Sequence, residues 1–172
     1  IKSLRPGQGC HACLLTVKGK LVGNLWVHCT AADRLLIDLP VAAKAGVMAS
    51  LDRHLIMDNA VLREVSTEIA QLGVYGTQAA QALDELLPGP LDGTLSTLPQ
   101  AHHRRVQGSG EELLIAAAQP LGIAGFHVLG RAAALNELHA RLLALGGLPP
   151  LDEAAEVLRV EAGIPLYGRD LD

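Results

Sequence analysis

The chain has 172 residues, 49% of them hydrophobic, which is enough apolar material for one large domain or two small ones. Its formal net charge is −4 and it has no dense cluster of Lys and Arg, so direct nucleic-acid binding through a broad basic face is not expected. Three cysteines are an odd number for a secreted disulfide framework and no apolar run reaches membrane-spanning length, so we expect a reducing, cytoplasmic setting without a membrane partner.

The first part of the chain has the pattern of a β-hairpin followed by a third strand and a helix. Two apolar runs rich in strand-forming residues flank Lys18-Gly19-Lys20, which predicts a hairpin turn. Pro40 suits the first turn of a helix, and apolar residues recur after it at helical spacing. The predicted elements are strands over 10–17, 21–30 and 34–39, a helix over 41–56, a turn at 58–59, and strands over 61–65 and 69–75.

The second part alternates helices with a second set of strands. Thr77 is the predicted N-cap of its first helix, which Pro88-Gly89-Pro90 would end. Gly108-Ser109-Gly110 separates the first two strands that follow. The predicted elements are a helix from 77 to 87, a loop over 91–101, strands over 103–107, 113–118 and 123–129, and helices over 132–145 and 152–162.

The order of these elements indicates the fold class. Strands follow one another in hairpins instead of alternating strictly with helices, which is typical of α+β proteins with helices on one face of mostly antiparallel sheets. We therefore predict two related ferredoxin-like halves, residues 1–76 and residues 77–172.

The thiols near the first hairpin raise the question of a metal site. Cys10 and Cys13 are spaced as in many metal and redox sites, and His28 and Cys29 follow the hairpin turn. Residues three apart on a strand point to opposite faces, as do adjacent ones, so at most one residue of each pair could converge on an ion. We therefore predict no metal site here. A metal or redox role would require the strand to begin only after Cys13.

Other chemical signals are weak. The run from His102 to Arg105 could contact an anion, but it also fits a solvated junction between loop and strand. The segment 122–125 has two glycines but lacks the following Lys and helix of a phosphate loop, so a bend between strands is expected. No Ser/His/Asp arrangement of a nucleophilic enzyme is recognisable, and we predict no catalytic residue from chemistry alone.

Four stretches taken together resemble the tetrahydrofolate-binding family of the glycine cleavage T-protein (aminomethyltransferase) and its YgfZ-like relatives. The most specific is the last, which reads LRVEAGIPLYGRDLD. The four stretches cover residues 4–9, 18–25, 121–128 and 158–172. Members of this family are about twice as long as this chain, so the resemblance implies a fragment that lacks the first strands and a C-terminal barrel.

The resemblance also implies a folate pocket, in which this chain departs from the T-protein at three places. The T-protein has an acidic pair where Gly23 and Asn24 stand, a Glu at His127 and an Arg at Ala155. An Asn cannot take up a proton at neutral pH as the carboxylate would. Each replacement removes a charge, which makes T-protein chemistry improbable.

The resemblance therefore favours a YgfZ-like protein that binds tetrahydrofolate and supports iron–sulfur cluster assembly or repair, and through it tRNA modification. Its expected partners are folate and iron–sulfur client proteins. The expected folate-binding residues are Asn24, Leu25, His127 and Arg159, although Arg159 also suits the bracing of a helix. Three alternatives stay open: an aminomethyltransferase of the glycine cleavage system, a relative of the fused folate-dependent oxidases and demethylases, and a scaffold that has lost folate binding.

Overall fold

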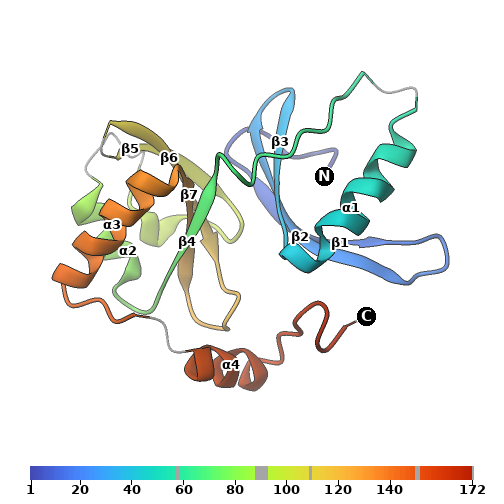
Figure 1. Ribbon diagram of the computed structural model, residues 1–172. Helices are drawn as coiled ribbons and strands as arrows, with labels where there is room; N and C mark the ends of the chain where they lie inside the picture. Colours follow the sequence, from blue (N-terminus) through green and yellow to red (C-terminus); the bar gives the residue numbers. More distant parts are fainter. Residues whose placement is uncertain (57–58, 88–92, 109, 150–151, 172) are drawn as a thin grey trace. The chain divides into compact units, whose positions relative to one another are not determined.

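A computed structural model describes residues 1–172 except 57–58, 88–92, 109, 150–151 and 172 (Figure 1). Four predicted features lie at least partly outside the described residues: the turn at 58–59, the helix stop at 88–90, the start of the loop at 91 and the middle of the 108–110 break. The chain divides into two compact units, residues 1–64 with 165–172 and residues 65–164.

The first unit is a three-stranded sheet with one helix. Its elements are β1 (Gly9–Leu15), β2 (Leu21–Ala31), β3 (Arg34–Asp38) and α1 (Val41–His54). The sheet has the order β1-β2-β3 with antiparallel pairs, and Gly19 takes a left-handed φ of 79° in the turn between β1 and β2. The predicted hairpin, third strand and helix are thus confirmed.

One predicted strand of this region is wrong. Residues 61–65 have no strand structure and run as an irregular segment after α1. Val61 is 94% exposed, so the apolar run that suggested a strand has no sheet to pack into. The segment is held to α1 at Glu64, whose carboxylate accepts a hydrogen bond from Lys44 at 2.7 Å.

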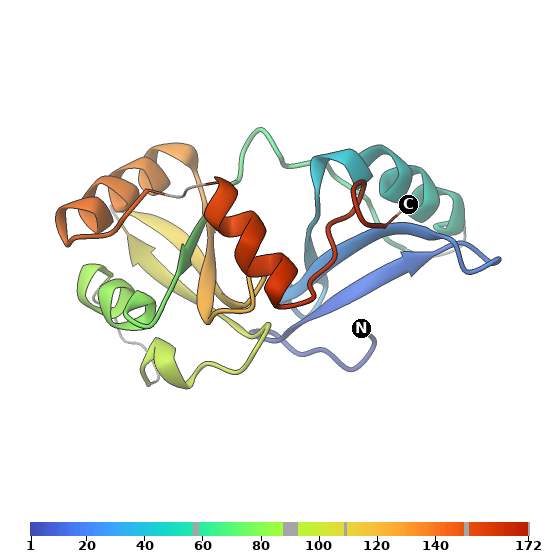
Figure 2. The ribbon, with the colours of Figure 1, turned by 90° about the horizontal axis from the view of Figure 1, so that it is seen from below.

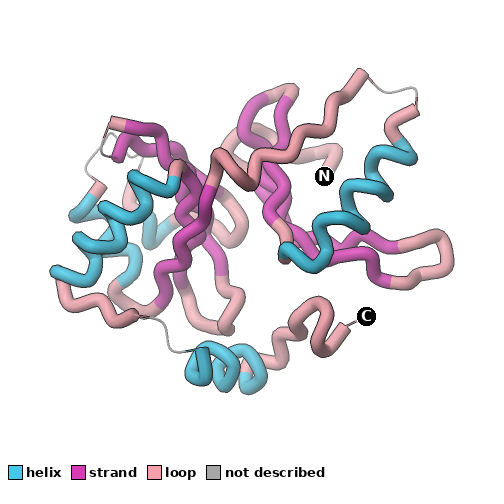
Figure 3. Tube along the Cα trace, in the orientation of Figure 1, coloured by secondary structure: helices cyan, strands magenta, loops and turns pink. Residues whose placement is uncertain are grey.

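The second unit has a four-stranded antiparallel sheet with helices on one face. Its elements are β4 (Ala70–Tyr75), α2 (Ala79–Leu86), a 3-10 turn (Leu95–Thr97), β5 (His103–Gly108), β6 (Glu111–Ala118), β7 (Gly125–Gly130), α3 (Ala132–Ala144) and α4 (Asp152–Glu161). The strand order is β4-β7-β6-β5. Helices α2 and α3 cover the same face, and their Leu and Ala side chains share one core with Ile115, Phe126 and Val128 (Figures 2 and 3).

The predicted α+β class with antiparallel sheets is confirmed. The connections depart from the ferredoxin-like βαββαβ order, because β6 passes to β7 through a turn and α3 follows β7. The unit boundary lies at 64/65 and not at 76, because β4 pairs with β7 along its whole length. The N-cap of α2 is Gln78 and not the predicted Thr77. The Gln78 side chain makes no capping hydrogen bond.

No helix in the described part of the chain combines the length and the apolar character that crossing a bilayer requires.

Candidate functional site

Strand β2 has one face against α1 and one face away from it. Leu25 and Val27 are buried in a core that they share with Ala43 and Val47 of the helix. Gly23 belongs to the same face, because a Cβ built on it would lie 2.8 Å from Val47 Cγ2. The close approach of α1 therefore requires a residue without a side chain at position 23.

The opposite face of the same sheet gathers polar and aromatic side chains, and we call it the Asn24 face. The register of the strands places Cys13 opposite Asn24, His11 opposite Trp26, and Asp38 on the other side of Trp26. Successive strand residues alternate between faces, so these five residues share the side away from α1. The sequence prediction identified Asn24 but missed His11 and Trp26. The predicted hairpin turn at Gly19 was the available signal, because the position of the turn sets which residues of the two strands lie opposite each other.

Asn24 has an unused hydrogen-bonding atom. Its Oδ1 is completely covered and has no hydrogen-bond partner among the described residues. A buried acceptor without a donor costs about 1–3 kcal/mol, which a hydrogen bond from a water molecule or from a bound ligand would offset. An N–H group of a ligand would supply such a bond.

His11 and Trp26 form a tilted pair of rings on the same face as Asn24. Their ring centroids lie 4.8 Å apart with an interplanar angle of 36°. Partial burial of the imidazole disfavours its charged form and lowers the pKa of His11 below its ordinary value of 6.5. At neutral pH the His11–Trp26 pair on the Asn24 face is therefore uncharged.

The thiols lie on different sides of the hairpin. Cys10 packs against the core beneath α1, whereas Cys13 is exposed on the Asn24 face. Cys29 is buried, and its Sγ donates a hydrogen bond to the Ala31 carbonyl at 3.3 Å. Strand β1 begins at Gly9, before Cys10, so the late strand start that a metal role would require does not occur. Among the residues described, no three His, Cys, Asp or Glu side chains form a group that could hold a metal ion.

His127 lies in the middle of β7, in the second unit. It is 5% exposed, and its ring meets the Tyr75 ring edge-on with centroids 6.1 Å apart. Two glycines make room for the Tyr75 ring. A Cβ at Gly73 would lie 2.5 Å from Tyr75 Oη, and a Cβ at Gly125 would also clash with the Tyr75 ring. His127 therefore lies in a buried position beside the Tyr75 ring.

The other two predicted folate residues have structural partners. The side chain of Leu25 is 6% exposed and lies in the core under α1, on the face opposite Asn24. Arg159 donates from Nε and Nη2 to the two carboxylate oxygens of Glu156, at 2.7 and 2.6 Å, and from Nη1 to the Ile164 carbonyl at 2.9 Å. These bonds tie the end of α4 to the residues that follow it, which is the bracing alternative considered for Arg159.

The basic run at residues 102–105 is divided between environments. His103 is buried, Arg104 donates to the Gly93 carbonyl at 2.5 Å, and Arg105 pairs with Glu112 at 3.3 Å. The run therefore presents no single cationic surface for an anion. Of the predicted site residues, Asn24 and Leu25 belong to the first unit, and His127 and Arg159 to the second.

The chain was compared with known families, proteins and structures. A family model described as "GCVT N-terminal domain" matches residues 1–172. A protein named aminomethyltransferase from a Picosynechococcus species is 32% identical over 172 residues, which cover 98% of this chain and 46% of that protein. An aminomethyltransferase from Stenotrophomonas maltophilia is 30% identical over 168 residues, covering 97% of this chain and 45% of its own length.

Among solved structures, the fold is similar to that of the glycine cleavage system aminomethyltransferase T from Bartonella henselae. The TM-score is 0.77 at 22% sequence identity, over 98% of this chain and 44% of that one. The chain therefore spans about half the length of the relatives that it matches.

Proposed function

The chain belongs to the GCVT N-terminal domain family, and from that premise we propose that it forms part of a tetrahydrofolate-binding site in a protein of the aminomethyltransferase type. The relatives compared above are named aminomethyltransferase, which favours this alternative over the YgfZ-like accessory role. Nothing in the comparisons supports iron–sulfur client proteins or an indirect role in tRNA modification, so we do not carry these expectations further.

The observation that carries the proposal is the covered, unpartnered Oδ1 of Asn24. The resemblance places Asn24 where the T-protein has the carboxylate that works on a folate nitrogen. A carboxamide oxygen accepts a hydrogen bond from an N–H group, as a carboxylate does, but it does not take up a proton near neutral pH. Asn24 is thus suited to hold a neutral N–H edge of a folate.

Bound tetrahydrofolate would supply the nitrogen atoms that accept a one-carbon unit. The Asn24 face would offer the ring system the tilted His11–Trp26 pair, with centroids 4.8 Å apart, on the same side of the sheet as the Asn24 amide. Aromatic side chains beside a few polar groups are the usual lining of sites for flat heterocycles. The residues of this face therefore fit a folate.

The remaining site residues take different parts in the proposal. His127 belongs to the second unit, and its place among the expected folate-binding residues rests on the resemblance. We assign Leu25 and Arg159 supporting parts, since the first packs under α1 and the second holds the end of α4.

The absence of a carboxylate at position 24 has a consequence for catalysis. A neutral amide holds the ligand but does not act as a general base, so aminomethyl transfer by the complete protein is expected to be slow. General acid–base catalysis contributes typically 10²- to 10⁴-fold, so restoring the carboxylate has a measurable effect.

The test is to compare aminomethyl transfer by the complete protein with that of its Asn24→Asp variant, with tetrahydrofolate as acceptor. We expect the variant to be faster by about tenfold or more, and an Asn136→Asp variant on the exposed side of α3 to match the unchanged protein. Rapid transfer by the unchanged protein, with loss of activity in Asn24→Asp, would contradict the assignment of Asn24. Absence of any tetrahydrofolate binding would instead support the scaffold alternative.

A further inference from the structure

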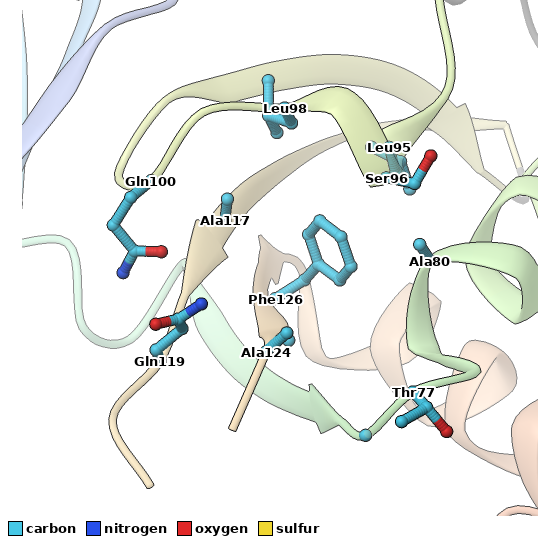
Figure 4. Close-up of a pocket in the computed structure, with 12 residues that line it drawn as sticks. Thr77, Ala80, Leu95, Ser96, Leu98, Gln100, Ala117, Gln119, Ala124 and Phe126 are labelled. Carbon is cyan, nitrogen blue, oxygen red and sulfur yellow. The ribbon is translucent and has the colours of Figure 1, made fainter. Parts of the chain in front are cut away.

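A hollow of about 310 Å³ lies on the helix-covered side of the sheet in the second unit (Figure 4). Its apolar lining includes Phe126, whose ring lies at the centre of the view, together with Leu95, Leu98 and Ala80. All the residues that line it belong to the second unit, whereas Asn24 belongs to the first, so the hollow is no part of the site proposed above.

Polar groups stand on both sides of the Phe126 ring. The carboxamides of Gln100 and Gln119 lie near each other on one side, and the hydroxyls of Thr77 and Ser96 lie on the other (Figure 4). No charged side chain lines the hollow, and within the described residues neither carboxamide has a hydrogen-bond partner. The hollow thus offers two donor–acceptor pairs to an uncharged molecule.

The backbone beneath the two carboxamides is held in place. Ala101, which follows Gln100, has a left-handed φ of 63°, an unusual conformation for a residue with a side chain. It is kept there by its N–H, which donates to the Ala117 carbonyl at 2.9 Å, while the Ala117 N–H donates to the His102 carbonyl at 2.9 Å. Residues held in strained conformations by their surroundings are concentrated at ligand sites, and this one fixes the position of Gln100.

We propose that this hollow binds a neutral, planar nitrogen heterocycle of the adenine class. A carboxamide matches the adjacent amino group and ring nitrogen of adenine, because it accepts from the first and donates to the second. The Phe126 ring, which is 6% exposed, adds apolar contact to the hollow. The lack of a cationic side chain in the lining selects the base and excludes tight recognition of a phosphate.

The test uses the complete protein with alanine methyl groups labelled for NMR. Adenosine is expected to shift the methyl signals of Ala80, Ala117 and Ala124, which line the hollow, and to leave that of Ala43 in the first unit unchanged. Purine riboside, which lacks the amino group of adenosine, is expected to bind about fivefold more weakly, as loss of one hydrogen bond requires. AMP is expected to bind no more tightly than adenosine.

Variants locate the binding. Gln119→Ala and Gln100→Ala are each expected to weaken adenosine binding by about fivefold or more, whereas Gln107→Ala, at an exposed position on β5, is expected to change nothing. Asn24→Leu is also expected to leave adenosine binding unchanged, which separates this proposal from the folate site. The proposal is overturned if adenosine shifts none of the three methyl signals, if toluene or N-acetyl-leucine amide binds as well as adenosine, or if the Gln variants behave like Gln107→Ala.

Discussion

His11 and Trp26 face each other across β1 and β2 with their ring centroids 4.8 Å apart. Trp26 is the single tryptophan of the chain, and it lies on the same face of the sheet as Asn24. Its fluorescence therefore reports on the face that we assign to folate. This ring contact also places a titratable imidazole beside the reporter.

The first prediction concerns the pH dependence of this fluorescence. Burial lowers the pKa of His11 below 6.5, so the imidazole stays neutral at neutral pH and becomes charged only at a pH below 6.5. Trp26 emission is expected to change with a midpoint below pH 6.5, and His11→Phe is expected to abolish that step. A midpoint above 6.5, or a step that survives in His11→Phe, would show that His11 is not the group observed.

The same shift sets the sign of a stability effect. Below pH 6.5 the unfolded chain binds a proton at His11 before the folded chain does. The contribution of His11 is therefore fully present above pH 6.5 and is lost as the pH falls through its lowered folded pKa. Denaturant unfolding over this range is expected to show wild type losing stability relative to His11→Phe as the pH falls.

The second prediction concerns the close approach of α1 to β2. Gly23→Ala places a Cβ 2.8 Å from Val47 Cγ2 and 3.0 Å from Ala43 Cβ, so the helix must move or the side chains must distort. We expect the free energy of unfolding to fall by about 1–3 kcal/mol in urea denaturation. Val47→Ala removes the nearer of the two clashing atoms. In the Val47→Ala background, Gly23→Ala is therefore expected to lower the free energy of unfolding by less than it does in wild type.

Gly46→Ala is the matched control for this substitution. Gly46 is exposed on α1, and a Cβ there would lie 3.5 Å from Val22 Cγ1, an ordinary contact. Alanine stabilises a helix relative to glycine, so the free energy of unfolding of this variant is expected to rise by about 0.5–1 kcal/mol. Equal effects of the two substitutions would contradict the packing that the structure shows at Gly23.

The third prediction separates bracing from ligand binding at Arg159. Arg159→Met removes the bonds to Glu156 and to the Ile164 carbonyl while it keeps much of the apolar stem. Hydrogen exchange in the last turn of α4 is expected to indicate a loss of about 1–3 kcal/mol in local stability. Arg131→Met, at a side chain that is 77% exposed, is the control and is expected to change little. An unchanged exchange pattern combined with a loss of folate affinity would make Arg159 a ligand contact.

Local patterns predicted most of the elements, and pairing between distant segments accounts for the differences. The turn at Gly19 and the alternation along β2 are local features, so the hairpin and the two faces of the sheet could be predicted. The unit boundary could not, because it depends on the pairing of β4 with β7, about fifty residues apart in the sequence. The strand predicted at 61–65 failed because its apolar residues have no sheet to join.

The candidate site shows the same division. Asn24 was chosen because of a resemblance to a family, and its face of the sheet follows from strand alternation. The covered state of its Oδ1 and the ring contact between His11 and Trp26 depend on side-chain packing, which a single sequence does not determine. Likewise, the room that Gly73 and Gly125 leave for Tyr75 is visible only once β4 and β7 are paired.

The most direct test of the account is the affinity of the complete protein for tetrahydrofolate, measured by calorimetry in three forms. The unchanged protein and Asn136→Leu are expected to bind equally, because Asn136 is exposed on α3. Asn24→Leu is expected to bind about tenfold more weakly, since it removes the acceptor that we assign to a folate N–H. Equal affinities in all three forms, or no binding in the unchanged protein, would contradict the folate site at Asn24.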